Sequence, residues 1–304
     1  MNNIPPPAPG NELPERLPRE FPGPLSGRLL GIDAGGSATR VALVADGQVT
    51  RRFTAPPMNA LLTGDLADRL AELIGAGDAT AAGVGMPGMR SPADAARLGE
   101  ELTRRAGCPV RVTGDGETAW LGAFGGAPGI AVFAGTGSGA MGCDGERWAR
   151  AGGHGFLLGD EGSASWIGRA AANAALRWED GSGGSAALRD AVAEASGGPL
   201  SALVDGVHSH PAERGRLALL APVVTALADQ DEAARRIALE AAGQLAELAV
   251  AVRRRLGPLT VCGMGGVLSA PVVWDRFAEL TGAVRPLAPP EVGAALLAGR
   301  GRVC

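Results

Sequence analysis

The sequence predicts an α/β protein of two similar lobes, and three observations point to that fold class. A strand, a glycine turn, a second strand and a hairpin turn follow one another from residue 28. The same order returns from residue 129, roughly 100 residues later, which is weak internal repetition of supersecondary structure. Helical periodicity then dominates from about residue 161 to residue 256.

Residues 1–27 contain eight prolines and almost no apolar periodicity. Such a segment cannot bury enough apolar surface to fold, so we expect an extended or disordered tail outside the fold. A proline-rich ligand for a partner domain is the alternative interpretation of this segment.

The first lobe opens with strands that return on themselves. Asp46-Gly47 is a hairpin signal, and a dinucleotide-binding fold would instead run from the glycine turn at 34–37 into a helix. The expected elements are strands at 29–33, 39–45, 48–54, 79–85 and 110–113, with helices at about 63–75 and 92–106.

The second lobe repeats this opening around the glycine turn 135–138 and the hairpin signal Asp144-Gly145. The expected elements are strands at 129–134, 139–143, 147–150 and 259–262, helices at about 161–178, 185–196, 213–229 and 231–256, then a helix, a short strand and a last helix from residue 290.

Composition excludes several classes of protein. All 28 basic residues are Arg, and the absence of Lys excludes a Walker-type phosphate loop, a protein kinase of the usual kind and a pyridoxal enzyme. A net charge of −4 argues against nucleic-acid binding. The four Cys have no metal-binding spacing. Without a signal peptide or an apolar run of about 18 residues, we expect a cytoplasmic protein that does not bind membranes.

Asp33 stands at the end of the first strand, beside the glycine turn. An Asp at that place can hold a hydrated Mg²⁺ while unhindered backbone N–H groups face phosphate oxygens. An ordinary hairpin with an Asx turn would give the same pattern. The phosphate-binding residues predicted here are Asp33, Gly35, Gly36, Ser37 and Thr39.

A second phosphate turn is predicted at Gly135, Thr136, Gly137 and Ser138. Its glycines let the backbone approach an anion, and its two hydroxyls add hydrogen-bond donors. The turn lies in the same strand–turn–strand context as the first one. Two such turns suit phosphoryl transfer, in which catalysis is mostly positioning and stabilisation of charge.

A third glycine motif, residues 83–88, matches the GxGxxG pattern of dinucleotide sites. Pro87 blocks a smooth entry into a helix, and Pro92 opens the next helix several residues late. We therefore do not expect a dinucleotide site there.

Carboxylates follow at two further places. Asp115 comes directly after the strand at 110–113 and could accept the proton of an attacking substrate hydroxyl, or it could cap the next helix. Asp160 and Glu161 lie in a glycine-rich segment, residues 152–163, and could bind sugar hydroxyls in pairs, although one of them could equally cap a helix.

Together these motifs resemble a known family. The Asp33 loop, the turn 135–138, the segment GGHGFLLGDEGSASWIGR at 152–169, the run CGMGGV at 262–267 and the stretch 290–298 occur in the order of the N-acetylglucosamine kinase branch of the actin/hsp70/hexokinase superfamily, also called the BadF/BadG/BcrA/BcrD ATPase family. The match covers about residues 28 to 300, and GDEGS after GGxG is its most specific part.

The resemblance implies a duplicated ribonuclease-H-like fold, as in actin-like ATPases, with ATP in a cleft between two lobes. The lobes would be residues 28–118, closed by a helix at about 290–300, and residues 119–289. It further implies Asp115 as the base that acts on the sugar 6-hydroxyl, ATP and Mg²⁺ as cofactors, and a homodimer. The implied adenosine-binding residues are Gly263, Gly265 and Gly266, and the implied sugar-binding residues are Asn59, Asp115, Gly153, His154, Asp160 and Glu161.

Three departures from the family pattern affect these expectations. The first motif has Ala38 where a basic residue is usual, and we expect Arg40 to alternate to the opposite face and not to replace it. His154 stands where Trp is common beside the sugar's 2-substituent, and Gly114 stands where a polar residue precedes the base.

The leading interpretation is a kinase that converts ATP and N-acetylglucosamine or glucosamine into the 6-phosphate and ADP, with N-acetylmuramic acid and glucose as open alternatives. An ATPase activator of a radical acyl-CoA dehydratase would need Cys placed to hold an iron–sulfur cluster, which the scattered Cys argue against. A non-catalytic sugar or nucleotide sensor is suggested by Ala38 and His154.

Overall fold

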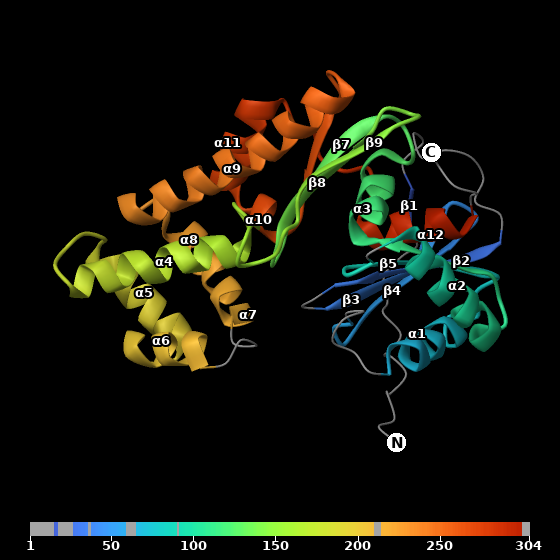
Figure 1. Cartoon of the computed structure of the whole chain (residues 1–304), viewed down its shortest axis with the longest axis horizontal. Coiled ribbons are helices and arrows are strands. Elements are labelled where there is room, and N and C mark those ends of the chain that lie inside the picture. Colours follow the sequence, from blue (N-terminus) through green and yellow to red (C-terminus); the bar gives the residue numbers. More distant parts are fainter. Residues whose placement is uncertain are drawn as a thin grey trace. The chain divides into compact units, whose positions relative to one another are not determined.

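The computed structural model describes residues 15–17, 27–35, 38–58, 65–89, 91–209 and 214–299. They form two compact units, shown in Figure 1: the first takes the described residues up to Ala127 and from Pro286 on, and the second is Pro128–Arg285. The sequence placed the boundaries after residues 118 and 289. A division at 118 would cut helix α3 (Asp115–Phe124), which is continuous and packs against α12 (Pro290–Gly299) inside the first unit.

Part of the expected tail belongs to the first unit. Strand β1 (Glu15–Arg16) pairs antiparallel with β4 (Gln48–Ala55), and the Leu17 N–H donates to the Gly47 carbonyl at 3.1 Å. The expectation that all of residues 1–27 lie outside the fold is therefore wrong at this point. Without β1, strand β4 would be an unpaired sheet edge, and such an edge accepts any strand that can reach it.

A six-stranded sheet forms the centre of the first unit, in the order β1-β4-β3-β2-β5-β6. The pairs β1–β4, β4–β3 and β3–β2 are antiparallel, whereas the pairs β2–β5 and β5–β6 are parallel. The remaining elements are β2 (Arg28–Ala34), β3 (Thr39–Ala45), β5 (Ala81–Met86), β6 (Val110–Gly114), α1 (Leu66–Gly75) and α2 (Pro92–Ala106).

Alternation along the strands sends the two faces of this sheet to different helices. Leu30 and Ile32 face α1 and α2 in a buried core. Gly31 and Gly83 face α12, where an added Cβ would lie 1.8 Å from the Glu291 carbonyl oxygen and 1.9 Å from that of Ala294. Within the GxGxxG pattern, Gly83 thus admits the close approach of α12, and an added Cβ at Gly85 would lie 2.0 Å from the Thr118 hydroxyl oxygen, so close packing accounts for these two glycines without a dinucleotide.

The second unit has a four-stranded sheet in the order β10-β7-β8-β9, with β10 parallel to β7 and the other pairs antiparallel. Its strands are β7 (Gly129–Ala134), β8 (Ser138–Cys143), β9 (Trp148–Gly152) and β10 (Val261–Met264). Its helices are α4 (Ala164–Glu179), α5 (Ala186–Ser196), α6 (Leu200–Ser209), α7 (Arg214–Leu217), the 3₁₀ turn η2 (Ala218–Leu220), α8 (Ala221–Leu227), α9 (Glu232–Leu256), α10 (Gly266–Ser269) and α11 (Pro271–Thr281).

Helix α9 is the longest element and lies under the sheet of this unit. Its N-cap Asp231 accepts a hydrogen bond from the Ala234 N–H at 2.8 Å, and its apolar face includes the buried Leu245 and Val252. The helix predicted at 213–229 is broken into α7, η2 and α8, because Pro222 lacks an N–H and cannot continue the preceding turn. None of the described helices is both long enough and apolar enough to cross a bilayer.

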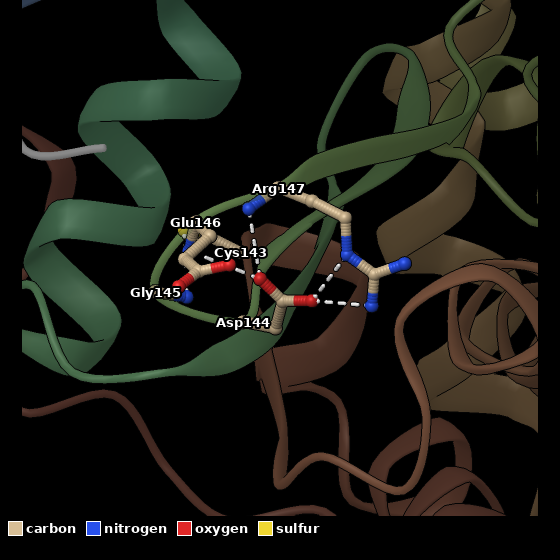
Figure 2. A network of polar contacts seen from close by, with 5 residues as sticks. All are labelled: Cys143, Asp144, Gly145, Glu146 and Arg147. Atoms are coloured by element: carbon tan, nitrogen blue, oxygen red, sulfur yellow. Dashed lines mark hydrogen bonds and ion pairs between the residues drawn. The ribbon is translucent and has the colours of Figure 1, made fainter.

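The predicted hairpin at Asp144-Gly145 is confirmed, and Figure 2 shows how one carboxylate closes it. Asp144 Oδ1 accepts hydrogen bonds from the N–H groups of Glu146 at 3.0 Å and Arg147 at 2.8 Å. Its Oδ2 lies 2.9 Å from Arg147 Nε and 2.7 Å from the guanidinium nitrogen Nη2. The backbone hydrogen bonds, above all that from Arg147, lower the pKa of Asp144 to about 2.

Candidate active site

Acidic side chains gather where the parallel strands of the first unit end. Asp33 on β2 is paired with Gly85 on β5, and Gly85 is paired with Thr113 on β6, so the three lie in one row across the sheet. Asp115 follows Thr113 by two residues and begins α3. Its charge acts on Asp33, and the two carboxylates predicted from sequence therefore share one site.

The surroundings of Asp33 favour a cation. The residue is 8% exposed, and its pKa is raised to about 7, first by burial and then by the negative charge of Glu291, with Asp115 adding to the effect and Arg40 opposing it. The described residues contain no group of three or more side chains that could hold a metal ion. Mg²⁺ commonly keeps several waters and binds one or two carboxylates together with phosphate oxygens, and Asp33 could serve as such a carboxylate.

The structure corrects the expected direction of Arg40. In the antiparallel pair β2–β3, Arg40 stands directly opposite Asp33, and directly opposed residues share a face of the sheet. A guanidinium nitrogen of Arg40 lies 3.6 Å from Asp33 Oδ2. The expectation that Arg40 points away from the motif is wrong. Positions 38 and 40 are two residues apart, and alternation along an extended strand places such residues on the same face, where Arg40 also meets Asp33.

Two predicted phosphate donors are used inside the protein. The Gly35 N–H donates to the carbonyl oxygens of Ala38 at 3.0 Å and Asp33 at 3.1 Å. The Thr39 hydroxyl is buried and donates to the Pro56 carbonyl at 2.9 Å. Gly36, Ser37 and Asn59, which were also predicted to bind ligand, lie outside the described residues.

Asp115 is half-buried at the start of α3. Its Oδ1 accepts a hydrogen bond from the adjacent Gly116 N–H at 2.9 Å, and Gly114 is the N-cap residue. The neighbouring acid, Glu117, accepts a hydrogen bond from the Thr113 hydroxyl. Of the two acids in this turn, Asp115 is the one that lies beside Asp33.

Glu291 is a member of this site that was not singled out from the sequence, where it falls within the expected last helix. It is 5% exposed at the start of α12, and its Oε1 lies 3.7 Å from Arg52 Nε. Its Oε2 is buried and has no hydrogen-bond partner among the described atoms. In the sequence, the only sign of this role is an acid directly after Pro289-Pro290. The packing of α12 against β2 is what brings Glu291 near Asp33.

In the second unit, the glycine turn is fastened to the loop at 153–162. The Gly135 N–H closes the turn by donating to the Gly137 carbonyl at 2.9 Å. The Ser138 N–H donates to Asp160 Oδ1 at 3.4 Å, and the Ser138 hydroxyl donates to the Glu161 carbonyl at 2.7 Å. An added Cβ at Gly137 would lie 2.9 Å from the Asp160 carboxylate, whereas one at Gly135 would meet open space.

Asp160 adopts a left-handed backbone conformation, with φ of 59°. Burial raises its pKa, while N–H groups of Ser138 and Gly155 lower it; Glu161 and the His154 side chain add smaller, opposed effects. The sequence predicted a sugar contact for this carboxylate, and the structure places it against the phosphate turn. Gly153 and His154 precede it in the same loop and are exposed.

The glycines predicted to bind adenosine divide into two kinds. A Cβ at Gly263 would meet Phe277 and Trp274 at 2.8 and 2.9 Å, and one at Gly265 would lie 2.4 Å from the Ala134 carbonyl oxygen. Both therefore serve close packing of β10. An added Cβ at Gly266 would meet open space, so this glycine is not explained by close packing.

The comparisons with known proteins identify the family and the fold. The profile of the BadF/BadG/BcrA/BcrD ATPase family matches residues 30–298. The structure named "putative N-acetylglucosamine kinase" from Chromobacterium violaceum is 30% identical, with 90% of this chain and 99% of that chain covered and a TM-score of 0.71. A Porphyromonas gingivalis protein with the same printed name is 23% identical, with 88% and 97% covered and a TM-score of 0.71.

A glucokinase of the ROK family from Streptomyces griseus, solved with glucose and AMPPNP, shares the fold at 17% identity, with 90% and 98% covered and a TM-score of 0.56. No curated protein sequence matches the chain. The two-lobed fold of the actin-like ATPases, predicted from the sequence, is confirmed by these neighbours. With the family profile spanning nearly the whole described fold, the chain belongs to the BadF/BadG/BcrA/BcrD ATPase family.

Proposed function

We propose that this protein is an ATP-dependent kinase that phosphorylates the 6-hydroxyl of an amino sugar, N-acetylglucosamine or glucosamine. The observation that carries the proposal is the pair of carboxylates, Asp33 and Asp115, on neighbouring parallel strand ends of one unit. One acid suits the metal–phosphate side of the reaction, and the other remains accessible to a substrate hydroxyl. The 30% identical neighbour from Chromobacterium violaceum is named a putative N-acetylglucosamine kinase, and this supports the choice of sugar.

In the proposed reaction, Asp115 accepts the proton of the 6-hydroxyl as its oxygen attacks the γ-phosphorus of ATP. A new P–O bond forms to the sugar, the bond to the bridging oxygen of the β-phosphate breaks, and ADP leaves. Mg²⁺ supplies charge neutralisation on the phosphates when it is bound. Asp33 would hold this ion through water, and in the second unit the open side of Gly135 leaves room for a phosphate group at its turn.

A coupled ADP-release assay across N-acetylglucosamine, glucosamine, N-acetylmuramic acid and glucose tests the proposal. We expect stimulation by an amino sugar, and the Asp115→Asn variant should lose phosphoryl transfer by 10²-fold or more while sugar affinity, measured by calorimetry, changes little. Glu117→Gln is the matched control, since this acid lies in the same helical turn and accepts from Thr113. Equal loss of affinity and turnover in Asp115→Asn would make Asp115 structural.

The sensor hypothesis is tested by the same assay, because a sensor would bind ATP without sugar-stimulated turnover. The activator hypothesis has less support. Cys262 is fully buried, and burial raises the pKa of its thiol to about 12, so it is not poised to ligate a cluster as thiolate. A colourless protein after anaerobic purification would agree with this, whereas a brown one would overturn the kinase proposal.

A further inference from the structure

A cavity of about 640 Å³ lies between α4 and α9 in the second unit (Figure 1), and its volume is typical of a small-molecule pocket. Asn173 and Arg177 line it from α4, and Arg236 and Glu240 line it from α9, together with the buried Ile237. Among the described residues, none of those predicted to bind ATP or sugar borders this cavity. It is therefore separate from the candidate active site.

The charged groups of the cavity are not paired with one another. Glu232, Arg236 and Glu240 follow at four-residue steps along α9, a spacing at which helices commonly form ion pairs. All three are exposed, and within the described part of the chain no ion pair or side-chain hydrogen bond engages them. Arg177 uses one guanidinium nitrogen on the Ser182 carbonyl, at 2.9 Å. The cavity thus offers cationic donors and anionic acceptors to a ligand.

This set of groups suits a ligand that carries both signs of charge. The guanidinium groups of Arg177 and Arg236 present planar forks of donors that fit a phosphate, and the carboxylates of Glu232 and Glu240 can face an ammonium group. The N-cap carboxylate of α9 also lines the cavity, but it is already bonded within its helix. An anion alone would leave the free acids uncompensated, and the amide of Asn173 adds a partner for hydroxyls.

The spacing of the charges favours one kind of zwitterion. Four residues of α-helix rise about 6 Å, so Arg236 stands roughly that far along the axis from Glu232 and from Glu240. In an α-amino acid the two charges lie on neighbouring atoms of one short unit. In an amino-sugar 6-phosphate, the sugar ring separates the phosphate from the amine and carries hydroxyls between them, which agrees better with this wall.

Helix α4 connects the cavity to the second glycine turn. At its start, the Ala164 N–H donates to the Gly135 carbonyl at 2.9 Å, and the Ser165 N–H donates to the Thr136 carbonyl at 3.3 Å. Near its other end, Arg177 lines the cavity. A ligand that contacts Arg177 therefore acts on the same packed element that is bonded to the turn.

We propose that this cavity is a regulatory site, which binds a phosphorylated amino sugar and lowers turnover through α4. Arg177 and Arg236 bind the phosphate, and Glu232 and Glu240 bind the ammonium group. The proposal rests on the proposed function, because the ligand is the product of that reaction with glucosamine. The site itself uses none of the residues to which the reaction was assigned.

Calorimetric titration of the full chain with glucosamine 6-phosphate, without ATP, tests the binding. We expect a binding event that Arg236→Gln and Arg177→Gln each weaken by 10-fold or more, because each removes charge-assisted hydrogen bonds to phosphate. N-acetylglucosamine 6-phosphate lacks the ammonium group and should bind this site more weakly. In Glu240→Gln the two sugar phosphates should differ less than in the wild type.

Arg235→Gln is the matched control. Arg235 precedes Arg236 on α9, is exposed, lies 3.9 Å from Asp229 and does not line this cavity. Its loss should leave the titration unchanged, and thermal unfolding shows whether each variant keeps its fold. In kinetics at saturating sugar, inhibition by glucosamine 6-phosphate should persist in Arg235→Gln and be lost in Arg236→Gln.

Wild-type affinity for glucosamine 6-phosphate in a folded Arg236→Gln variant would overturn the proposal, as would an equal loss in Arg235→Gln. Equal affinity of the wild type for both sugar phosphates would overturn the role of the two Glu, and unchanged inhibition of Arg236→Gln would overturn the regulation. If the wild type shows no sugar-stimulated turnover but still loses the binding event in Arg236→Gln, only the kinase proposal fails. If it shows turnover but no such event, only the regulatory site fails.

Discussion

The carboxylate of Asp160 accepts a hydrogen bond from the backbone N–H of Ser138, and one side chain thereby joins the glycine-rich loop at 153–162 to the phosphate turn. The Ser138 N–H is one of the donors of the turn that was predicted to bind phosphate, and here it donates to the protein itself. The bond also requires Asp160 to keep a left-handed backbone conformation, which Asp and Asn tolerate better than most other residues.

Asp160→Ala should therefore destabilise the protein by about 1–3 kcal/mol, for two reasons. The substitution removes the carboxylate that accepts the hydrogen bond from Ser138, and Ala has no polar side chain to offset the strain of a left-handed backbone with φ of 59°. Asp160→Asn should cost less than half as much, since its amide oxygen still accepts and Asn adopts this conformation readily. Urea unfolding measures both. Equal losses for the two variants would show that the Ser138 contact contributes nothing.

Features that depend on neighbouring residues in the chain could be predicted from the sequence, whereas contacts between distant elements could not. The two glycine turns, their flanking strands and the hairpin at Asp144 were predictable, because turn chemistry and alternation are local. The position of Arg40 was misread because its partner, Asp33, lies on the neighbouring strand. Glu291 was missed because it lies 258 residues from Asp33 along the chain.

The same limit applies to helices. Helix α6 was not predicted, because it has only 10 residues and buries only Leu200 and Leu203, which is a short pattern to recognise. Helix α9 was predicted at 231–256 and found at Glu232–Leu256, because a long amphipathic face leaves little ambiguity.

The glycines beneath α12 should be intolerant of side chains. Gly83→Ala would place a Cβ 1.9 Å from the Ala294 carbonyl oxygen, a backbone atom that moves only with its helix. We expect a loss of about 3 kcal/mol or more in the free energy of unfolding. Gly75→Ala is the control in the same unit: it ends α1, its Cβ would meet nothing, and it should be neutral or slightly stabilising. A folded, equally stable Gly83→Ala variant would contradict the described packing of α12.

The raised pKa of Asp33 predicts a pH-dependent stability. In the unfolded chain this carboxyl titrates near 3.8, and in the folded protein near 7, so the folded state binds the proton more tightly. The free energy of unfolding should fall as pH rises from about 4 to about 7, by at most about 4 kcal/mol from this group.

Asp33→Asn removes the titration, so the variant should be more stable than the wild type at pH 8 and nearly equal to it at pH 4. Denaturant unfolding across this range measures the difference, and saturating Mg²⁺ with AMPPNP should reduce it, because bound cation stabilises the ionised wild type. A difference between the two proteins that did not depend on pH would refute the assignment of the shift to Asp33.

Glu291→Gln tests one cause of that shift separately. The substitution keeps the volume of a buried side chain but removes the negative charge that, after burial, contributes most to the raised pKa of Asp33. The pKa of Asp33 should fall, and Asp33→Asn should then stabilise the Glu291→Gln protein less at pH 8 than it stabilises the wild type. The four proteins form a double-mutant cycle whose coupling should be largest at pH 8 and vanish near pH 4, where both folded states hold a neutral Asp33. Additive effects at pH 8 would mean that burial and Asp115 raise this pKa without Glu291, and that Glu291 matters only through its contact with Arg52 at 3.7 Å.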